Sequence, residues 1–232
     1  MELNSIAFIP DGNRRYAKLS GYSLSQTYYS GTQKAWDVIN WMKDYPNVKF
    51  GTFYTLSLEN LHRSRTELNV LFKIFEKELD KVKQQPIIDE GDIRLNFIGR
   101  KELFPKSIQT KMSAAEEFTA ANKGKTINLA LGYNGQAEIV DAAKKLALAY
   151  KEGNIDLSNI DEKQFRKFLY SDFAEPDLII RTGQTQRLSG FLTYQSAYSE
   201  LYFSNKYWPE FNEADLKIAV DSYHERARKF GK

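Results

Sequence analysis

The chain has 232 residues, 42% of them hydrophobic and 14% aromatic, so it can bury a substantial core. Its formal charge of +3, from 33 basic and 30 acidic residues, is too balanced for bulk attraction to nucleic acid, so any anion site must be local. The absence of cysteine excludes disulfides, thiolate catalysis and Cys-type zinc sites. We therefore expect a cytoplasmic protein with no nucleic-acid partner.

Six apolar stretches rich in Ile, Val, Phe and Tyr predict β-strands. In chain order they are Ser5 to Pro10, Val48 to Ser57, Ile93 to Gly99, Thr126 to Tyr133, Asp177 to Arg181 and, more weakly, Glu200 to Ser204. The first stretch is too short, and too soon followed by an acidic residue, to be a signal peptide or membrane span.

Segments with helical spacing lie between the predicted strands. They are Ser25 to Asp44, Arg65 to Gln85, Phe104 to Asn122, Gly135 to Glu152, Glu162 to Tyr170 and Glu213 to Phe230. The alternation predicts an α/β fold with a mostly parallel central sheet of about six strands and helices on both faces. We find no internal repeat or linker, so a single domain over 1–232 is expected.

Ligands of parallel sheets bind beyond the carboxyl ends of the strands, and unusual residues follow three of the predicted strands. Asp11-Gly12-Asn13 follows the first, and the stretch 57–63 ends the second and continues beyond it. Arg181-Thr182-Gly183 ends the fifth. These three segments are therefore the candidates for a shared site.

The segment PDGNRRYAK places the Asp11 carboxylate, a Gly-Asn turn and the arginines Arg14 and Arg15 at a candidate helix start. Helix-end N–H groups and guanidinium groups suit a diphosphate, and a neighbouring carboxylate can recruit Mg²⁺. The commoner structural explanation is a turn that caps a helix, with solvated arginines.

The loop after the second predicted strand offers Ser57, Glu59, Asn60 and Arg63, which taken alone only start a helix. Ser64 and Glu67 fit a capping box that opens this helix. The segment DLIIRTGQTQRLSGF favours a second anion site more strongly, because a buried strand delivers Arg181 into a glycine-containing loop followed by Arg187 and Ser189. Surface arginines on a mobile loop are the alternative.

An apolar stripe at helical spacing could line a tunnel for an isoprenoid tail, although core packing explains such stripes more often. Its members are Leu68, Leu71, Phe72, Phe75, Leu79 and Val82. The two histidines, His62 and His224, are not spaced as a metal pair. The chain also lacks the P-loop, HExxH and GxSxG motifs. Their absence disfavours nucleotide hydrolysis of the P-loop type, zinc-dependent proteolysis and α/β-hydrolase chemistry.

Taken in order, these segments resemble the cis-prenyltransferase family, whose best-known type is undecaprenyl diphosphate synthase. The resemblance covers nearly the whole chain and includes IAFIPDGNRRYAK, FYTLSLENLHRS, IRLNFIGR, INLALGYNGQAEIVDA, DLIIRTGQTQRLSGFLTYQSAYSELYF and WPEF. It implies the family's fold, a homodimer, a Mg²⁺ cofactor and an allylic prenyl diphosphate donor. The DDxxD motifs of trans-type synthases are absent.

The resemblance also implies residue roles. Asp11 resembles the essential aspartate that helps Mg²⁺ hold the departing diphosphate, and Asn60 stands where the family places a residue implicated in proton removal. Positions that bind the allylic diphosphate are matched by Gly12, Asn13, Arg14, Arg15 and Arg63. The substrate loop before Asn60 contains Ser57, Leu58 and Glu59. Positions that bind the second diphosphate are matched by Arg181, Arg187, Leu188 and Ser189.

The resemblance further implies that Glu200 is a second metal-associated carboxylate. Several positions depart from the family pattern. Tyr16 and Leu61 stand where tryptophans are usual, and Leu24 and Tyr28 replace an arginine and a histidine. Departures also occur at Gln184, Thr185 and Gly190. The Arg14-Arg15 pair and the Leu24/Tyr28 replacement are similar to lavandulyl diphosphate synthase, a relative that joins prenyl units irregularly, although Asn13 is retained here.

We therefore expect transfer of a prenyl group from an allylic diphosphate to isopentenyl diphosphate, with formation of a Z double bond. Three alternatives stay open: condensation of two allylic diphosphates, transfer to an acceptor that is not a prenyl diphosphate, and a noncatalytic partner subunit. A lipid product would bring the enzyme to the membrane periphery. We also expect Asp11 to contribute little to packing, because it is a strand-end carboxylate facing solvent or metal.

Overall fold

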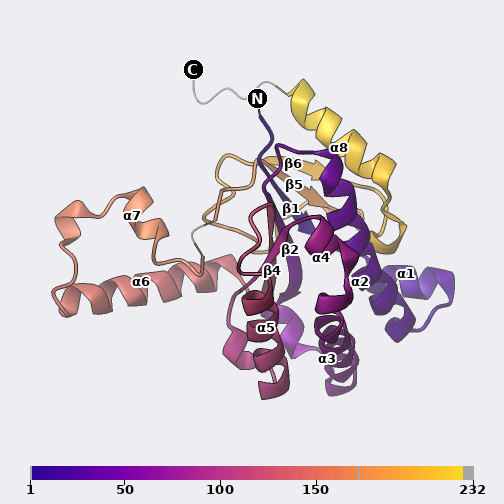
Figure 1. The fold of residues 1–232 in the computed structure, drawn as a ribbon, viewed down its shortest axis with the longest axis horizontal. Coiled ribbons are helices and arrows are strands. Elements are labelled where there is room, and N and C mark those ends of the chain that lie inside the picture. The colour runs from indigo at the N-terminus through magenta and orange to yellow at the C-terminus, as the bar shows by residue number, and fades with distance from the viewer. Residues whose placement is uncertain (1, 172, 227–232) are drawn as a thin grey trace.

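The computed structural model describes residues 2–171 and 173–226, and within them it confirms the α/β fold. Six strands form one sheet in the order β3-β4-β2-β1-β5-β6, and every neighbouring pair is parallel (Figure 1). Their bounds are β1 (Ser5–Ile9), β2 (Phe50–Ser57), β3 (Ile93–Ile98), β4 (Lys125–Tyr133), β5 (Leu178–Arg181) and β6 (Glu200–Phe203). All six predicted strands are present, and β1 lies between β2 and β5, deep inside the sheet.

Helices connect the strands and agree broadly with the predicted segments. Their bounds are α1 (Asn13–Ser20), α2 (Leu24–Trp41), α3 (Arg65–Asp80), α4 (Pro86–Glu90), α5 (Lys106–Phe118), α6 (Gly135–Lys151), α7 (Glu162–Arg166) and α8 (Glu213–Glu225). The helix expected to reach Gln85 ends at Asp80, and Pro86 opens a separate short helix. The last predicted helix is described to Glu225, and positions 227–230 of that prediction lie outside the described residues.

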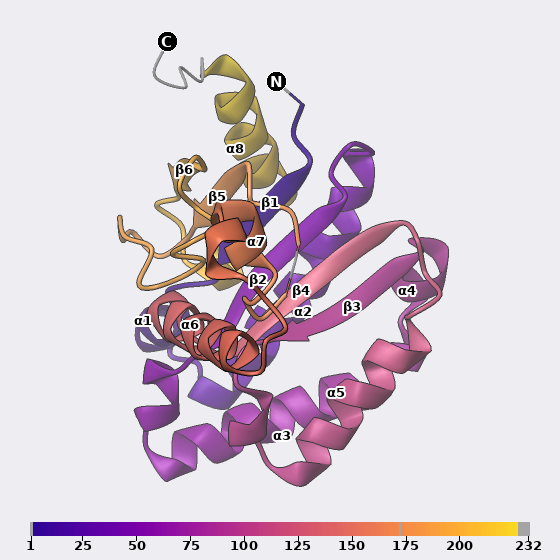
Figure 2. The ribbon, with the colours of Figure 1, turned by 90° about the vertical axis from the view of Figure 1, so that its left-hand side faces the viewer.

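One face of the sheet carries the larger core. Alternate strand residues such as Ile6, Phe8 and Ile180 point to this face, as the two-residue period of a strand requires. Side chains from α2, α3, α4, α5 and α8 pack against them. Figure 2 shows α3 and α5 running along this side of the sheet.

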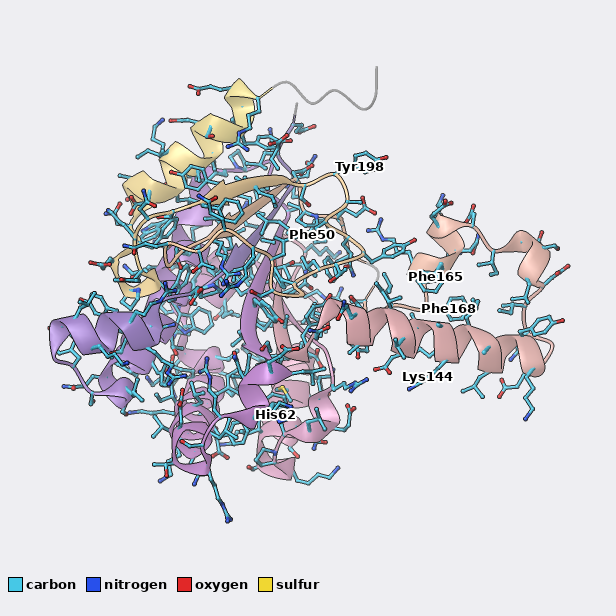
Figure 3. The ribbon with its side chains drawn as sticks, turned by 180° about the vertical axis from the view of Figure 1, so that it is seen from behind. Phe50, His62, Lys144, Phe165, Phe168 and Tyr198 are labelled. Atoms are coloured by element: carbon cyan, nitrogen blue, oxygen red, sulfur yellow. The ribbon has the colours of Figure 1, made fainter. Side chains whose placement is uncertain are left out.

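The other face is covered more by loops than by helices. Ala7, Ile9 and Ile179 point to this face and contact Phe173 and Phe191, which come from the segments before β5 and after it. The helix α6 begins at the sheet and projects from the body together with α7 (Figure 1). Figure 3 shows Lys144 and Phe165 on this projecting arm, away from the strand ends of the sheet.

Among the described residues, no helix combines the length and apolar character that crossing a membrane requires.

Candidate active site

Two pockets meet where the strands end, and five residues line both of them. The shared residues are Pro10, Asp11, Tyr54, Asn60 and Arg63. One pocket has a volume of about 560 Å³ and is walled mainly by apolar side chains. The other, of about 850 Å³, is lined largely by polar and charged side chains. The fold therefore places a hydrophobic compartment next to a polar one, with a carboxylate and a guanidinium at the junction.

The apolar pocket extends between the sheet and two helices. From α3, Leu71, Phe72, Phe75 and Leu79 line it, and Val82 follows just beyond that helix. Of the predicted apolar stripe, only Leu68 does not line the pocket. Trp36 of α2 and Phe97 of β3 form other parts of the wall. The residues of the stripe thus pack against the core and also border a cavity, and the isoprenoid tail stays a prediction.

The polar pocket contains all four residues predicted for the second diphosphate, together with residues of the predicted substrate loop. Ser57 and Glu59 line it from one loop, and Arg181, Arg187, Leu188 and Ser189 line it from another. Of the residues predicted for the allylic diphosphate, Gly12, Asn13, Arg14 and Arg15 line the apolar pocket instead, and Arg63 lines both pockets. Tyr28 also lines the apolar pocket. Apart from Arg63, the two predicted groups of residues therefore lie in different compartments.

Asp11 joins two arginines that come from opposite ends of the sequence. Its Oδ1 lies 3.1 Å from Nη2 of Arg15, and its Oδ2 accepts a 2.7 Å hydrogen bond from Nη2 of Arg181. The Arg181 side chain is only 5% exposed. The predicted meeting of Asp11 and Arg181 in one hollow is confirmed. The expectation that Asp11 matters little to packing is wrong, because a nearly buried guanidinium depends on its charge.

Backbone geometry fixes the Asp11 turn. Gly12 has a φ of +105°, and a Cβ atom at this position would lie 2.5 Å from the Tyr207 ring. The backbone N–H of Trp208 donates to the Asp11 carbonyl over 3.0 Å, and Thr182 Oγ1 accepts from the Asp11 N–H. Only glycine fits this turn, because both the conformation and the close ring exclude a side chain.

The loop after β5 closes around Arg181. The Nη1 group of Arg181 donates to Ser189 Oγ over 2.8 Å and also to the carbonyl oxygen of Arg187. Tyr54, whose hydroxyl donates to the Tyr133 carbonyl over 3.1 Å, lies at the junction of the pockets. Burial raises the pKa of the Tyr54 hydroxyl. Sequence reasoning missed Tyr54, because an inward-facing tyrosine in a strand resembles any other core residue.

A second carboxylate, Glu67, pairs with Arg63 of the junction but lines neither pocket. The Tyr28 hydroxyl donates to Glu67 Oε1 over 2.5 Å, and Arg63 Nη1 lies 3.2 Å from the same oxygen. Burial, reinforced by Glu67, raises the pKa of Tyr28, so this hydroxyl stays a proton donor. The predicted capping box is half formed: Ser64 Oγ accepts from the Glu67 N–H, but the Glu67 carboxylate faces Tyr28 and Arg63 instead of the helix end.

The loop after β2 is held by its own side chains and by Asn134. The backbone N–H of Asn60 donates to Ser57 Oγ over 3.1 Å, and Glu59 Oε1 accepts from Asn134 Nδ2 over 2.7 Å. Asn134 also caps α6 and lines the polar pocket. Its position had a signal that we did not use, since Asn134-Gly135 follows a predicted strand just as Asp11-Gly12 does.

Some predicted site residues lie outside both pockets. Tyr16, Leu24, Leu58 and Leu61 line neither, and Leu24 is exposed as the first residue of α2. His62 is exposed in the loop before α3 and also lines neither pocket (Figure 3).

Glu200 is not brought to Asp11 within this chain. It opens β6 opposite Leu178, whereas Arg181, at the other end of β5, lies opposite Phe203. Since Leu178 is itself in register with Ile6, Asp11 lies five residues, about 16 Å, further along the strand direction. The Glu200 carboxylate instead pairs with Arg226 at 3.0 Å. The two carboxylates therefore do not meet within one chain, and the metal-associated role of Glu200 stays a prediction.

The donor set at Asp11 still fits Mg²⁺. Mg²⁺ in phosphate-transfer sites is commonly held by one or two carboxylates together with substrate phosphates and water. Asp11 provides one partly exposed carboxylate between the pockets. Within the described residues there is no group of three acidic, histidine or cysteine ligands, so the substrate itself would have to provide the other oxygen ligands.

This combination of a parallel sheet, arginines gathered at its strand ends and an adjoining apolar pocket defines a site for a diphosphate that carries a hydrophobic chain. Comparison with known proteins agrees. Residues 9–231 match the prenyltransferase family described as putative undecaprenyl diphosphate synthase, so the chain belongs to this family and is a prenyltransferase.

Similar proteins include two archaeal enzymes, both named tritrans,polycis-undecaprenyl-diphosphate synthase (geranylgeranyl-diphosphate specific). That of Methanocaldococcus jannaschii is 40% identical and that of Pyrobaculum aerophilum 39%, each over 98% of this chain, with 82% and 95% of the relatives covered. Among solved structures, lavandulyl diphosphate synthase from Lavandula x intermedia in complex with dimethylallyl diphosphate has a TM-score of 0.95 and 36% identity, over 100% of this chain and 99% of that one. A probable undecaprenyl diphosphate synthase from Campylobacter jejuni has a TM-score of 0.82 and 25% identity over the full length of both chains.

Proposed function

We propose that the protein transfers a prenyl group from an allylic diphosphate in the apolar pocket to isopentenyl diphosphate in the polar pocket, and that the new double bond is Z. The single observation that carries this proposal is the junction of the two pockets at Asp11, Asn60 and Arg63. The names of the archaeal relatives, which are polycis synthases, support the same stereochemistry.

The chain's own groups suit the departure of diphosphate. We expect Arg14, Arg15 and Arg63, which line the apolar pocket, to bind the donor diphosphate. Because charge grows on the leaving group as the C–O bond breaks, guanidinium groups held in advance stabilise the transition state more than the bound substrate. Bound Mg²⁺ would further neutralise that charge at Asp11. The apolar walls exclude water from the allylic cation.

The polar pocket suits the acceptor. We expect Arg181, Arg187 and Ser189, which line this pocket, to bind its diphosphate and so to hold the acceptor double bond toward the junction. Asn60 lies on both pockets and is the candidate to receive or relay the proton that must leave after the new bond forms.

Irregular condensation of two allylic diphosphates is the second candidate. It is favoured by the close structural similarity to lavandulyl diphosphate synthase and by the replacement of the usual arginine and histidine with Leu24 and Tyr28. Transfer to an acceptor that is not a prenyl diphosphate is the third candidate, and it predicts no condensation product from prenyl diphosphates alone.

Three further properties belong to this proposal. We expect Mg²⁺ as the cofactor, a homodimer as the assembly, and a cytoplasmic enzyme that meets membranes at their periphery through its lipid product. Size-exclusion chromatography with light scattering tests the assembly, and replacement of Mg²⁺ by EDTA tests the cofactor.

The decisive experiment incubates the purified protein with Mg²⁺ and labelled dimethylallyl, geranyl, farnesyl or geranylgeranyl diphosphate, with and without isopentenyl diphosphate. Products are identified by mass, and the double-bond geometry by NMR. We expect a Z-prenyl diphosphate that forms only when isopentenyl diphosphate is present. A product formed from the allylic diphosphate alone would favour the irregular reaction and overturn the leading proposal.

A further inference from the structure

Glu67 is the second carboxylate at which arginines of the site converge, and it lines neither pocket. Its side chain is 10% exposed, with Arg63 Nη1 at 3.2 Å and Arg14 Nε at 4.0 Å. The arrangement parallels Asp11, which also lies between two arginines. Unlike Asp11, however, Glu67 contributes to neither pocket wall, whereas Arg63 lines both pockets and Arg14 lines the apolar one.

Tyr28 completes a closed triangle with Glu67 and Arg63. Its hydroxyl donates to Glu67 Oε1 over 2.5 Å and accepts from Arg63 Nη1 over 3.2 Å. Each of the three side chains comes from a different element, since Tyr28 lies on α2, Arg63 ends the loop after β2, and Glu67 lies in the first turn of α3. The triangle therefore fixes Arg63 against two helices.

The contacts of the triangle involve only Nη1 of Arg63. A guanidinium has five N–H donors in a rigid plane, so holding one nitrogen sets the direction of the others. Arg63 lines both pockets, and its remaining donors are available to a diphosphate at the junction. Without the triangle, Arg63 would have to lose the rotamer freedom of a long side chain each time a ligand binds.

We infer that Glu67 is a positioning residue for prenyl transfer: together with Tyr28 it holds Arg63 in the orientation that binds a diphosphate at the junction of the pockets. This inference rests on the proposed use of Arg63 as a diphosphate ligand. The inferred role is additional to the part in a helix cap that the sequence predicts for Glu67.

The charge of Glu67 and its contact with Arg63 make opposite predictions for anion affinity. If charge alone mattered, removing the Glu67 carboxylate would remove a repulsion and strengthen the binding of a nearby anion. If Glu67 positions Arg63, removing its side chain should weaken the binding of that anion. Glu67→Gln removes the charge but keeps an acceptor of the same shape, whereas Glu67→Ala removes both.

The test measures the binding of inorganic pyrophosphate and Mg²⁺ to purified variants by calorimetry, a readout that needs no acceptor and no catalysis. We expect Glu67→Ala to bind pyrophosphate about tenfold more weakly than wild type, on the scale of a lost charged hydrogen bond. Glu67→Gln should bind as tightly as wild type or more tightly. Tighter binding in both variants, or no change in Glu67→Ala, would overturn the inference.

A double-mutant cycle with Arg63→Ala separates positioning from a general structural role. If Glu67 acts through Arg63, adding Glu67→Ala to Arg63→Ala should cause no further loss of affinity. Additive losses would show that Glu67 acts elsewhere and would refute the positioning role. Melting temperatures of all variants show whether each protein is folded.

Glu76→Ala is the matched control. It removes a carboxylate from the same helix, and Glu76 pairs with Lys111 at 3.4 Å and lines neither pocket. We expect its pyrophosphate affinity to equal that of wild type. If wild type itself does not bind pyrophosphate, the proposed function fails. If wild type binds pyrophosphate and Glu67→Ala binds it equally well, only the inference about Glu67 fails.

Discussion

At the scale of single residues, Asp11 has two tasks with different physical consequences. It offers a carboxylate to the junction of the pockets, and it neutralises Arg181, whose side chain is 5% exposed. A guanidinium so deeply buried is costly without a partner, because the protein interior replaces little of its hydration.

Asp11→Ala should therefore impair both activity and stability. We expect product formation to fall at least about a hundredfold, the scale for losing one preorganised electrostatic contact. The free energy of unfolding should fall by about 2 kcal/mol, because Arg181 loses its partner. Steady-state kinetics and urea unfolding measure the two effects.

Asp37→Ala serves as the control for Asp11→Ala. The Asp37 carboxylate is half exposed and pairs with Lys34 on the same helix, so its removal should change stability by less than about 0.5 kcal/mol. Unchanged turnover in Asp11→Ala would remove Asp11 from the mechanism.

Site residues could be predicted from the sequence where they directly follow a predicted strand. Asp11-Gly12 and Arg181 follow strands directly, so the parallel topology alone brings them to one edge. Glu67 and Tyr54 were not recognised, because their roles depend on contacts with residues far away in the sequence. The distance between Glu200 and Asp11 within one chain could not be predicted either, because a motif position does not say at which end of a short strand its carboxylate lies.

At the scale of elements, the inner face of α3 packs against the core and also lines the apolar pocket. It begins at Arg65, beside Arg63 at the junction, and Leu79 lies fourteen residues later, about 21 Å along the axis. Leu79 and Val82 therefore lie far from the diphosphate end of the apolar pocket. The tail of a long prenyl chain would reach this distal end.

Leu79→Trp should shorten the longest product. The larger ring would fill the distal part of a cavity of about 560 Å³ and stop chain growth earlier. Mass analysis of products made with excess isopentenyl diphosphate tests this, and Leu148→Trp at an exposed position of α6 is the control. An unchanged longest product in Leu79→Trp would mean that the tail does not occupy this part of the cavity.

Element types could be predicted more accurately than their ends. The periodicity of 65–85 predicts one helix, but the structure divides this stretch at Lys81, and the proline at 86 cannot continue a hydrogen-bonded turn. The helix α1 was only suggested by a candidate start, because its eight residues present few apolar positions to a pattern search. The cavity between α2, α3 and the sheet could not be predicted, since an apolar stripe looks the same whether it faces a side chain or a void.

At the scale of the whole molecule, buried tyrosines make stability sensitive to high pH. Burial raises the pKa of Tyr133, whose hydroxyl donates to Glu138 over 2.5 Å, and burial likewise raises the pKa of Tyr28. An unfolded tyrosine has a pKa of about 10. Below that pH both states hold the proton, and above it only the folded state does, so the stabilising effect is complete below pH 10 and is lost as the pH rises.

We expect the free energy of unfolding to fall above pH 10 by up to about 1.4 kcal/mol per pH unit for each of these tyrosines. Urea unfolding between pH 8 and about 11.5 measures the slope. Tyr133→Phe should make the slope shallower, whereas Tyr22→Phe, at an exposed position, should leave it unchanged. A slope that does not respond to Tyr133→Phe would contradict this explanation.

The Asp11 turn is closed by Tyr207 and Trp208, and β1 has β5 as one of its two neighbours. The chain must therefore be synthesised as far as Arg181 before β1 acquires its second partner, and as far as Trp208 before the Asp11 turn acquires its support. The active site around Asp11 would therefore stay incomplete during most of the synthesis of the chain. Catalytic competence should then appear late and abruptly during translation.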